Sequence, residues 1–183
     1  HTNSCMRQQF SSELNIRISQ FAADFVTNLR RYMGGDEQVP ELRIQNFGYL
    51  YLADSDVFAN SLRASHLVQV AAGAGTRLLN ADQIAREYPF YQLDDIVLGS
   101  IDTGDEGYWD SITVFDWWRK SARQRGIEYV TNEVVGIERN AAGDRIDSVT
   151  LASGEKIACG HLVNASGPRA CQTSRMAGIE VPV

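Results

Sequence analysis

The chain has 183 residues and a formal net charge of −6, and 44% of its residues are hydrophobic. This length and composition fit about one globular domain with a core of its own. The acidic balance disfavours nucleic acid and anionic membrane surfaces as partners, and no apolar run approaches the roughly 20 residues of a membrane span. Three cysteines, an odd number, favour a reducing, cytoplasmic compartment over a disulfide framework.

Helices and strands alternate through the first two thirds of the chain. In residues 13–33 the apolar positions recur at spacings of 4, 3, 4 and 4, which predicts one helix with a single apolar stripe. The stripe consists of Leu14, Ile18, Phe21, Phe25 and Leu29. Strands are predicted at 47–53 and 95–101, and three more helices at 55–75, 80–89 and 110–126.

The last third changes to short strands joined by tight turns. We predict strands at 127–131, 133–139, 146–152, 155–160 and 161–167. A helix, a strand, a three-stranded meander and a strand that ends in a small-residue turn are typical of the second half of a dinucleotide-binding domain in flavoprotein oxidoreductases. The last strand is then expected to return to a parallel sheet and to end beside the cofactor.

Five segments in order resemble the interior of a D-amino-acid-oxidase-type FAD-dependent oxidoreductase, in the branch that oxidises sarcosine, glycine and dimethylglycine. They are RQQFSSELNIRISQFAADF (7–25), GYLYLA (48–53), EGYWDSITVFDWWRKSARQRG (106–126), EVVGIE (133–138) and LVNASGP (162–168). The resemblance implies an α/β (α+β) fold, with part of an FAD-binding Rossmann-like domain, its antiparallel β-meander crossover, and part of a mixed-sheet substrate domain. The implied FAD-domain segments are 1–38 and 105–183, and the implied substrate-domain segment is 39–104.

The resemblance also implies which residues contact FAD, along the flavin ring, at the adenine and near the pyrophosphate. These residues are Ser4, Cys5, Met6, Arg7, Val134, Val135, Asn164, Ala165, Ser166 and Gly167. A small-residue turn suits the last four, because it lets phosphate oxygens approach backbone N–H groups. The alternatives are structural: an ion pair for Arg7, core positions in a strand for the valines, and an ordinary strand exit for the turn. Some relatives attach FAD covalently through a histidine of the first segment, a role that we do not expect of His1.

The implied activity of the full-length parent is oxidation of a small amine or amino acid by hydride transfer from its C–N carbon to flavin, which gives an imine that hydrolyses. The flavin carries this chemistry, so no catalytic side chain is assigned. No metal site is expected. The sequence contains no G-x-G-x-x-G phosphate loop, and we therefore expect this chain alone to bind FAD weakly or not at all. The alternative is a non-catalytic subunit or interaction module that retains the fold; an oligomer is compatible with either.

Overall fold

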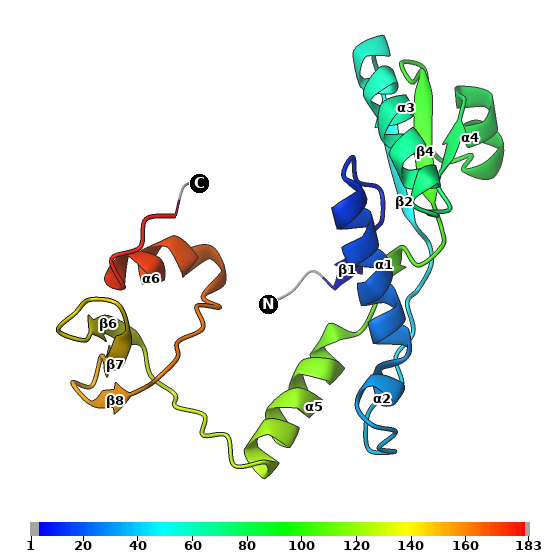
Figure 1. Ribbon diagram of the computed structural model, residues 1–183. Coiled ribbons are helices and arrows are strands. Elements are labelled where there is room, and N and C mark those ends of the chain that lie inside the picture. The colour runs from blue at the N-terminus through cyan, green and yellow to red at the C-terminus, as the bar shows by residue number, and fades with distance from the viewer. Residues whose placement is uncertain (1–3, 182–183) are drawn as a thin grey trace. The chain divides into compact units, whose positions relative to one another are not determined.

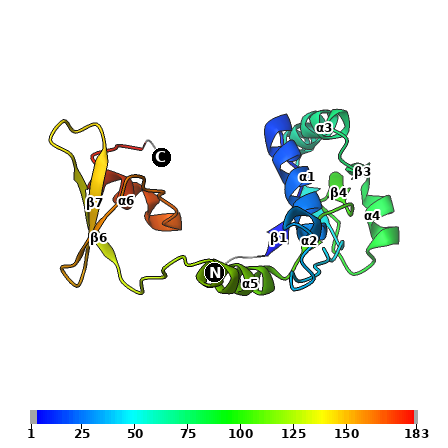
Figure 2. The same cartoon turned by 60° about the horizontal axis from the view of Figure 1, so that its bottom comes forward.

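The computed structural model describes residues 4–181 and divides into two compact units, His1–Gly126 and Ile127–Val183 (Figures 1 and 2). Antiparallel sheets with helices beside them confirm the predicted mixed α/β fold class. The elements of the first unit are β1 (Cys5–Met6), α1 (Glu13–Thr27), α2 (Leu29–Tyr32), β2 (Tyr49–Ala53), α3 (Asp56–Ala71), β3 (Arg77–Leu79), α4 (Ala81–Glu87), β4 (Leu98–Asp102), β5 (Gly107–Tyr108) and α5 (Ser111–Gln124). Within residues 4–181, no helix has both the length and the apolar character needed to cross a membrane.

The main sheet of the first unit has the strand order β2-β4-β3, and both pairings are antiparallel. Side chains of β2 alternate between two faces. Leu50 and Leu52 join the apolar cluster formed with α4, whereas Ala53 joins the cluster formed with α3. Figures 1 and 2 show these two helices on either side of β4. Tyr49 and Tyr51 share the face of Ala53 but lie outside the α3 cluster, so they are available for polar contacts.

The chain that leads into β2 runs very close to β5, which pairs with β1 on its other side. The Gln45 N–H donates to the Tyr108 carbonyl over 2.7 Å, and the Gly48 N–H donates to the Glu106 carbonyl over 3.0 Å. Gly48 has φ +79°, and a Cβ added there would lie 2.2 Å from the carbonyl oxygen of Asp102. Only glycine fits this approach, which lets the chain that enters β2 lie against the end of β4.

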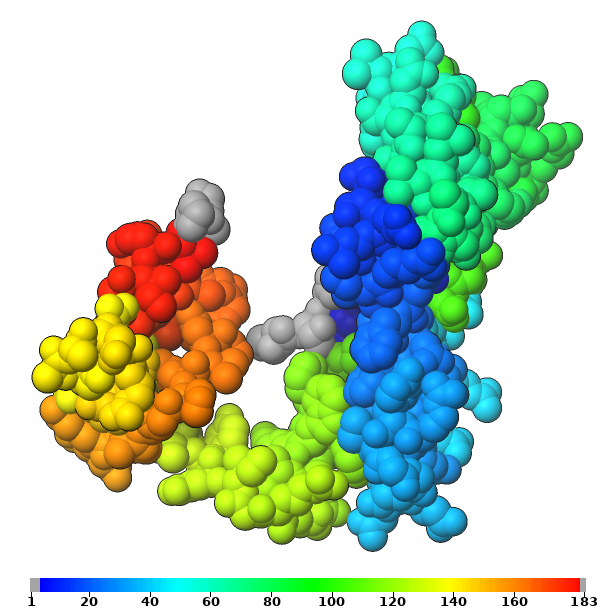
Figure 3. Space-filling model, in the orientation of Figure 1, coloured from blue at the N-terminus to red at the C-terminus, as the bar shows by residue number. Residues whose placement is uncertain are grey.

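The single helix predicted for residues 13–33 is wrong, because it is interrupted at Asn28. The Asn28 side chain donates to the carbonyl and carboxylate oxygens of Asp24, and its own backbone leaves the helical region at φ −110° and ψ 27°. Such local side-chain bonds compete with helix continuation. Leu14, Ile18 and Phe21 of the predicted stripe are exposed, and Figure 3 shows α1 uncovered on the visible face of this unit. The buried residues of α1 are Ile16, Ala23 and Val26.

The second unit is an antiparallel meander followed by a short helical segment. Its elements are β6 (Val134–Arg139), β7 (Ile146–Leu151), β8 (Lys156–Ala158), η1 (Gly167–Arg169) and α6 (Ala170–Met176). The meander confirms the three predicted central strands. The strands predicted at 127–131 and 161–167 are wrong, since both segments are irregular. A strand needs a neighbour for its backbone N–H and C=O groups, and residues 4–181 provide neither segment with one.

The close approach at Gly48 generates a test of stability. We expect Gly48→Ala in the full-length protein to lower the free energy of unfolding by about 3 kcal/mol, because the added methyl must displace the Asp102 carbonyl. Gly34→Ala is the matched control: its φ is +83°, but nothing lies within 4 Å of the added Cβ. It should cost only about 1 kcal/mol. Urea unfolding followed by circular dichroism measures both, and equal losses would contradict this role of Gly48.

Candidate functional site

A polar and aromatic cluster lies where the chain leaves β1 and meets the tyrosine-bearing part of β2. The Arg7 guanidinium donates to the Tyr51 hydroxyl over 2.5 Å, and its carbon lies 4.6 Å from the ring centroid of Phe10. Within residues 4–181, no carboxylate lies within 4.0 Å of this guanidinium, so the structure does not show the ion pair considered for Arg7. A half-buried cation held by a ring and a hydroxyl is suited to receive an anion.

Tyr49 and Cys5 complete this cluster. A hydrogen bond to the Cys5 thiol raises the pKa of Tyr49 to about 12, with a further contribution from burial. The phenol therefore keeps its proton throughout the physiological range, and its one O–H is engaged with the Cys5 thiol. Cys5 is exposed and shares its side of the chain with Arg7, two residues later. We call the set of Cys5, Arg7, Phe10, Tyr49 and Tyr51 the arginine–tyrosine cluster.

The other two residues predicted along the flavin point away from this cluster. Ser4 is buried, with its hydroxyl 2.5 Å from the hydroxyl of Ser111. Met6 is buried in the apolar core beside Val26 and Val114. The alternation of β1 accounts for this difference. Any contact of Ser4 or Met6 with a cofactor would therefore run through the backbone.

The fully buried carboxylate of Glu106 binds the backbone that follows Arg7. The sequence did not indicate a role for this residue. The Glu106 carboxylate accepts hydrogen bonds from the backbone N–H groups of Gln8 and Gln9 and from the Gln9 side-chain amide. Burial raises the pKa of Glu106, these bonds oppose the shift, and the neighbouring Asp102 adds to it. In the sequence, Glu106 stands in an acidic loop, GDEGYWDS, and the aromatic residues that follow it are the only sign that it is buried.

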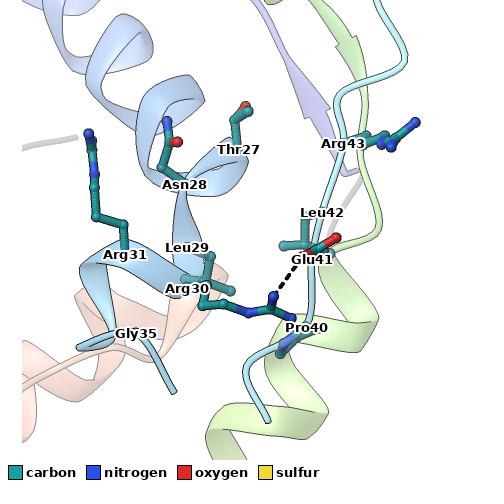
Figure 4. A pocket seen from close by; sticks show the side chains of 10 residues that line it. All are labelled: Thr27, Asn28, Leu29, Arg30, Arg31, Gly35, Pro40, Glu41, Leu42 and Arg43. Carbon is teal, nitrogen blue, oxygen red and sulfur yellow. Dashed lines mark hydrogen bonds and ion pairs between the residues drawn. The ribbon is translucent and has the colours of Figure 1, made fainter. Parts of the chain in front are cut away.

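A further cavity of the first unit lies elsewhere, between α2 and the chain that follows it (Figure 4). It has a volume of about 650 Å³, and none of the predicted cofactor residues line it. Arg30 reaches Glu41 across it over 2.6 Å, whereas Arg31 pairs with Asp24 over 3.1 Å. Figure 4 shows Arg43 directed away from that pair. Because these charges are compensated or diverge, the cavity offers no convergent binding groups.

In the second unit, a cavity of about 280 Å³ gathers part of the predicted cofactor set. Val134, Asn164 and Ser166 line it, together with the apolar side chains of Ile137 and Met176. Half of Val135 is exposed, and it does not line this cavity; a β-bulge between Val134 and Gly136 interrupts the strand pairing at this residue. The cavity therefore combines an apolar wall with a small-residue turn, which fits the adenosine end of a dinucleotide.

The turn beside this cavity is built by its own side chains. The Asn164 amide donates to the Ala170 carbonyl over 2.8 Å, and its side-chain oxygen accepts the Ser166 N–H over 3.2 Å. Gly167 has φ +56°, and nothing lies within 4 Å of a Cβ added there. Ala165 and Gly167 are next to the lining residues rather than among them. Open space at Gly167 is what close approach of a phosphate group requires.

The cavity also brings in a residue that the sequence reading did not assign. Arg169 lines it and forms an exposed ion pair with Glu133 over 3.2 Å. It follows the turn directly, so its proximity to a proposed phosphate position was a signal available in the sequence. Within residues 4–181, no group of three or more metal-binding side chains occurs.

The curated proteins that are similar to this chain are oxidoreductases that are longer than it is. It is 28% identical over 191 residues to the FAD-dependent oxidoreductase domain-containing protein 1 of Xenopus laevis, covering 95% of this chain and 38% of that protein. It is 34% identical over 148 residues to a Drosophila melanogaster homolog, covering 81% and 28%. The chain thus spans less than two fifths of the length of these relatives.

Solved structures share the fold over nearly the whole chain. The L-proline dehydrogenase of P. horikoshii has a TM-score of 0.75 and 23% identity, covering 97% of this chain and 45% of that one. The glycine oxidase of Geobacillus kaustophilus has a TM-score of 0.73 and 15% identity, covering 98% and 48%. A sequence model of the family described as FAD dependent oxidoreductase matches residues 4–183. The chain belongs to this family of FAD-dependent oxidoreductases.

Proposed function

We propose that this chain is part of an FAD-dependent enzyme that oxidises a C–N bond of an amino acid, or of a related small amine. The observation that carries the proposal is Arg7, a half-buried cation that has no carboxylate partner in residues 4–181 and that lies beside two tyrosines. Amino acids carry the carboxylate that such a cation binds. The similar solved structures, a proline dehydrogenase and a glycine oxidase, support this substrate class.

In this proposal the arginine–tyrosine cluster binds and orients the substrate. The Arg7 guanidinium pairs with the carboxylate, and the Tyr51 hydroxyl, which accepts a bond from Arg7, donates its own proton to the same carboxylate. Tyr49 keeps its proton, because the hydrogen bond to Cys5 and burial raise its pKa to about 12, and it therefore brings no competing negative charge to the site. Phe10 shields the cation from water. FAD, when bound, accepts the hydride from the carbon next to the substrate nitrogen.

The predicted FAD contacts remain proposals and divide into two groups. Cys5 and Arg7 are proposed to present side chains toward the flavin ring, with Ser4 and Met6 contributing backbone only. At the other end the proposed contacts are Val134, Val135, Asn164, Ala165, Ser166 and Gly167. The cavity beside the last group and the open space at Gly167 support this assignment. We also keep as proposals the domain segments 1–38, 39–104 and 105–183 and a cytoplasmic location.

An uncovered apolar groove supports the proposal that this chain is a piece of a longer enzyme. Apolar side chains from α1, α5 and the end of β5 line a groove of about 280 Å³, among them Phe21, Phe25, Trp109 and Trp118. Water-exposed apolar surface of this kind is usually covered by another segment or partner. We propose that the rest of the parent protein covers it and completes the FAD site, so that this chain alone binds FAD weakly or not at all. The alternative, a non-catalytic interaction module, requires that the full-length protein carry no FAD.

The direct test of the proposed function is anaerobic mixing of the full-length protein with a panel of amino acids. Loss of the oxidised-flavin absorbance with at least one amino acid is the expected result. Peroxide formation on admission of air then distinguishes an oxidase from a dehydrogenase. A protein purified without flavin, or a flavin that no amino acid or amine reduces, would contradict the proposal.

A second prediction concerns the turn at the cofactor end. Gly167→Val should weaken FAD binding by the full-length protein about tenfold, because a branched side chain fills the space that the cofactor approaches. Gly154→Val is the matched control, since Gly154 also has a positive φ, +86°, and open space, but lies in the turn between β7 and β8. Bound FAD per protein after dialysis is the measurement. Equal retention by the two variants would remove the turn from the FAD site.

A third prediction concerns Arg7. Arg7→Met keeps much of the side-chain length but removes the charge, and should lower kcat/KM for the amino-acid substrate about 100-fold. The kcat/KM for the corresponding amine, which lacks the carboxylate, should fall far less. Arg43→Met, an exposed arginine of the cavity in Figure 4, is the control and should change neither rate. An equal loss for amino acid and amine would show that Arg7 does not bind the carboxylate.

A further inference from the structure

We propose that Glu106 is a positioning residue that holds Arg7 in the geometry required to bind a substrate carboxylate. Glu106 is fully buried and forms no ion pair with the Arg7 guanidinium, so it acts through the backbone and through Gln9. The inference rests on the proposed function, which supplies the carboxylate. It assigns a role in substrate selectivity to a residue outside the arginine–tyrosine cluster.

The first step of the argument is the turn that follows β1. Met6 is paired with Gly107 in the ladder between β1 and β5. Immediately after Arg7, the N–H groups of Gln8 and Gln9 both donate to one oxygen of the Glu106 carboxylate. The backbone of Arg7 is thus fixed on both sides, by the ladder before it and by the carboxylate after it. The direction of its side chain follows from this fixed backbone.

The second step is the connection to the strand that carries the tyrosines. The Gln9 amide donates to the Tyr49 carbonyl over 2.8 Å and to the second oxygen of Glu106 over 3.0 Å. Its oxygen accepts the Ser100 hydroxyl over 2.8 Å. Glu106 and Gln9 therefore join the segment after β1 to both β2 and β4. They fix the position of Arg7 relative to Tyr51, the hydroxyl that its guanidinium contacts.

The third step is that a carboxylate is required at residue 106, and an amide is a poor substitute. A carboxylate can only accept, so its second oxygen forces the NH₂ group of Gln9 to face it. A glutamine at this position would place one NH₂ group against another. Gln9 would then have to turn over, and the Tyr49 carbonyl would lose its donor. No Lys, Arg or His side chain within residues 4–181 forms an ion pair with Glu106, so the donors to its carboxylate are the backbone N–H groups of Gln8 and Gln9 and the Gln9 amide.

The test measures binding of propionate, a carboxylate with no amine to oxidise, and of its uncharged analogue propionamide. Isothermal titration calorimetry measures both ligands on the full-length protein. The variants are Glu106→Gln, Glu106→Ala, Arg7→Met and the double variant Arg7→Met/Glu106→Ala, each compared with the unaltered protein. We expect Glu106→Ala to weaken propionate binding about tenfold with little effect on propionamide, since misplacing a binding group removes the charged contact selectively. Glu106→Gln should lie in between, because its oxygen can still accept the two backbone bonds.

The double variant separates positioning from general destabilisation. If Glu106 acts through Arg7, Glu106→Ala should have no further effect on propionate binding once Arg7 is methionine. Asp102→Asn is the matched control: Asp102 is also a buried carboxylate and accepts the Gly104 N–H, but it forms no hydrogen bond with Gln8 or Gln9. It should lower stability and leave the preference for propionate unchanged.

Each outcome distinguishes the inference from the function on which it rests. Failure of the unaltered protein to bind propionate, or unchanged binding in Arg7→Met, would contradict the proposed carboxylate site itself. If Arg7→Met weakens propionate binding but neither Glu106→Gln nor Glu106→Ala does so, only the role of Glu106 is overturned. Additive losses in the double variant, or equal losses for propionate and propionamide, would also overturn it. If Glu106→Ala does not fold, Glu106→Gln alone decides, by the ratio of its propionate affinity to its propionamide affinity.

Discussion

The hydrogen bonds between the Glu106 carboxylate, the Gln8 and Gln9 backbone and the Gln9 side chain connect the separate parts of the first unit. They join β1 to β2 and β4, three strands that are distant in sequence and belong to two different sheets. Without this network the two-residue β1 would be held chiefly by its pairing with an equally short β5. Because the network is buried and polar, its bonds are strong only while all of them are made.

This network explains why the candidate site combines residues from such different places. Arg7 and Cys5 come from the chain around β1, whereas Tyr49 and Tyr51 come from a sheet that two helices otherwise cover. The close backbone approach at Gly48 places the beginning of β2 against the end of β4, and the Gln9 amide joins the chain after β1 to Tyr49. A cation can then lie against an aromatic ring and a hydroxyl without an acidic partner, an arrangement that is favourable mainly when an external anion completes it.

The sequence predicted the periodic elements well and the unpaired ones poorly. The capping box of α4, formed by Asn80 and Gln83, and the meander of the second unit follow from local signals that are present in a few residues. The strands expected at 127–131 and 161–167 have the right composition, but a strand also depends on a distant neighbour that composition does not specify. The apolar stripe of α1 was identified correctly as a pattern, yet Leu14, Ile18 and Phe21 remain exposed, because burial depends on what covers a helix.

For the candidate site, the sequence indicated Cys5 and Arg7 but missed the tyrosines and Glu106. Their proximity is created by the antiparallel register of β2 and β4 and by the pairing of β1 with β5, which no local pattern specifies.

The central claim is that Arg7 and Tyr51 bind the substrate carboxylate. A crystal structure of the full-length protein with FAD and propionate tests it most directly. We expect both propionate oxygens within hydrogen-bond distance of the Arg7 guanidinium and the Tyr51 hydroxyl. Propionate bound elsewhere, with Arg7 paired to an acidic side chain of the parent protein, would contradict the account.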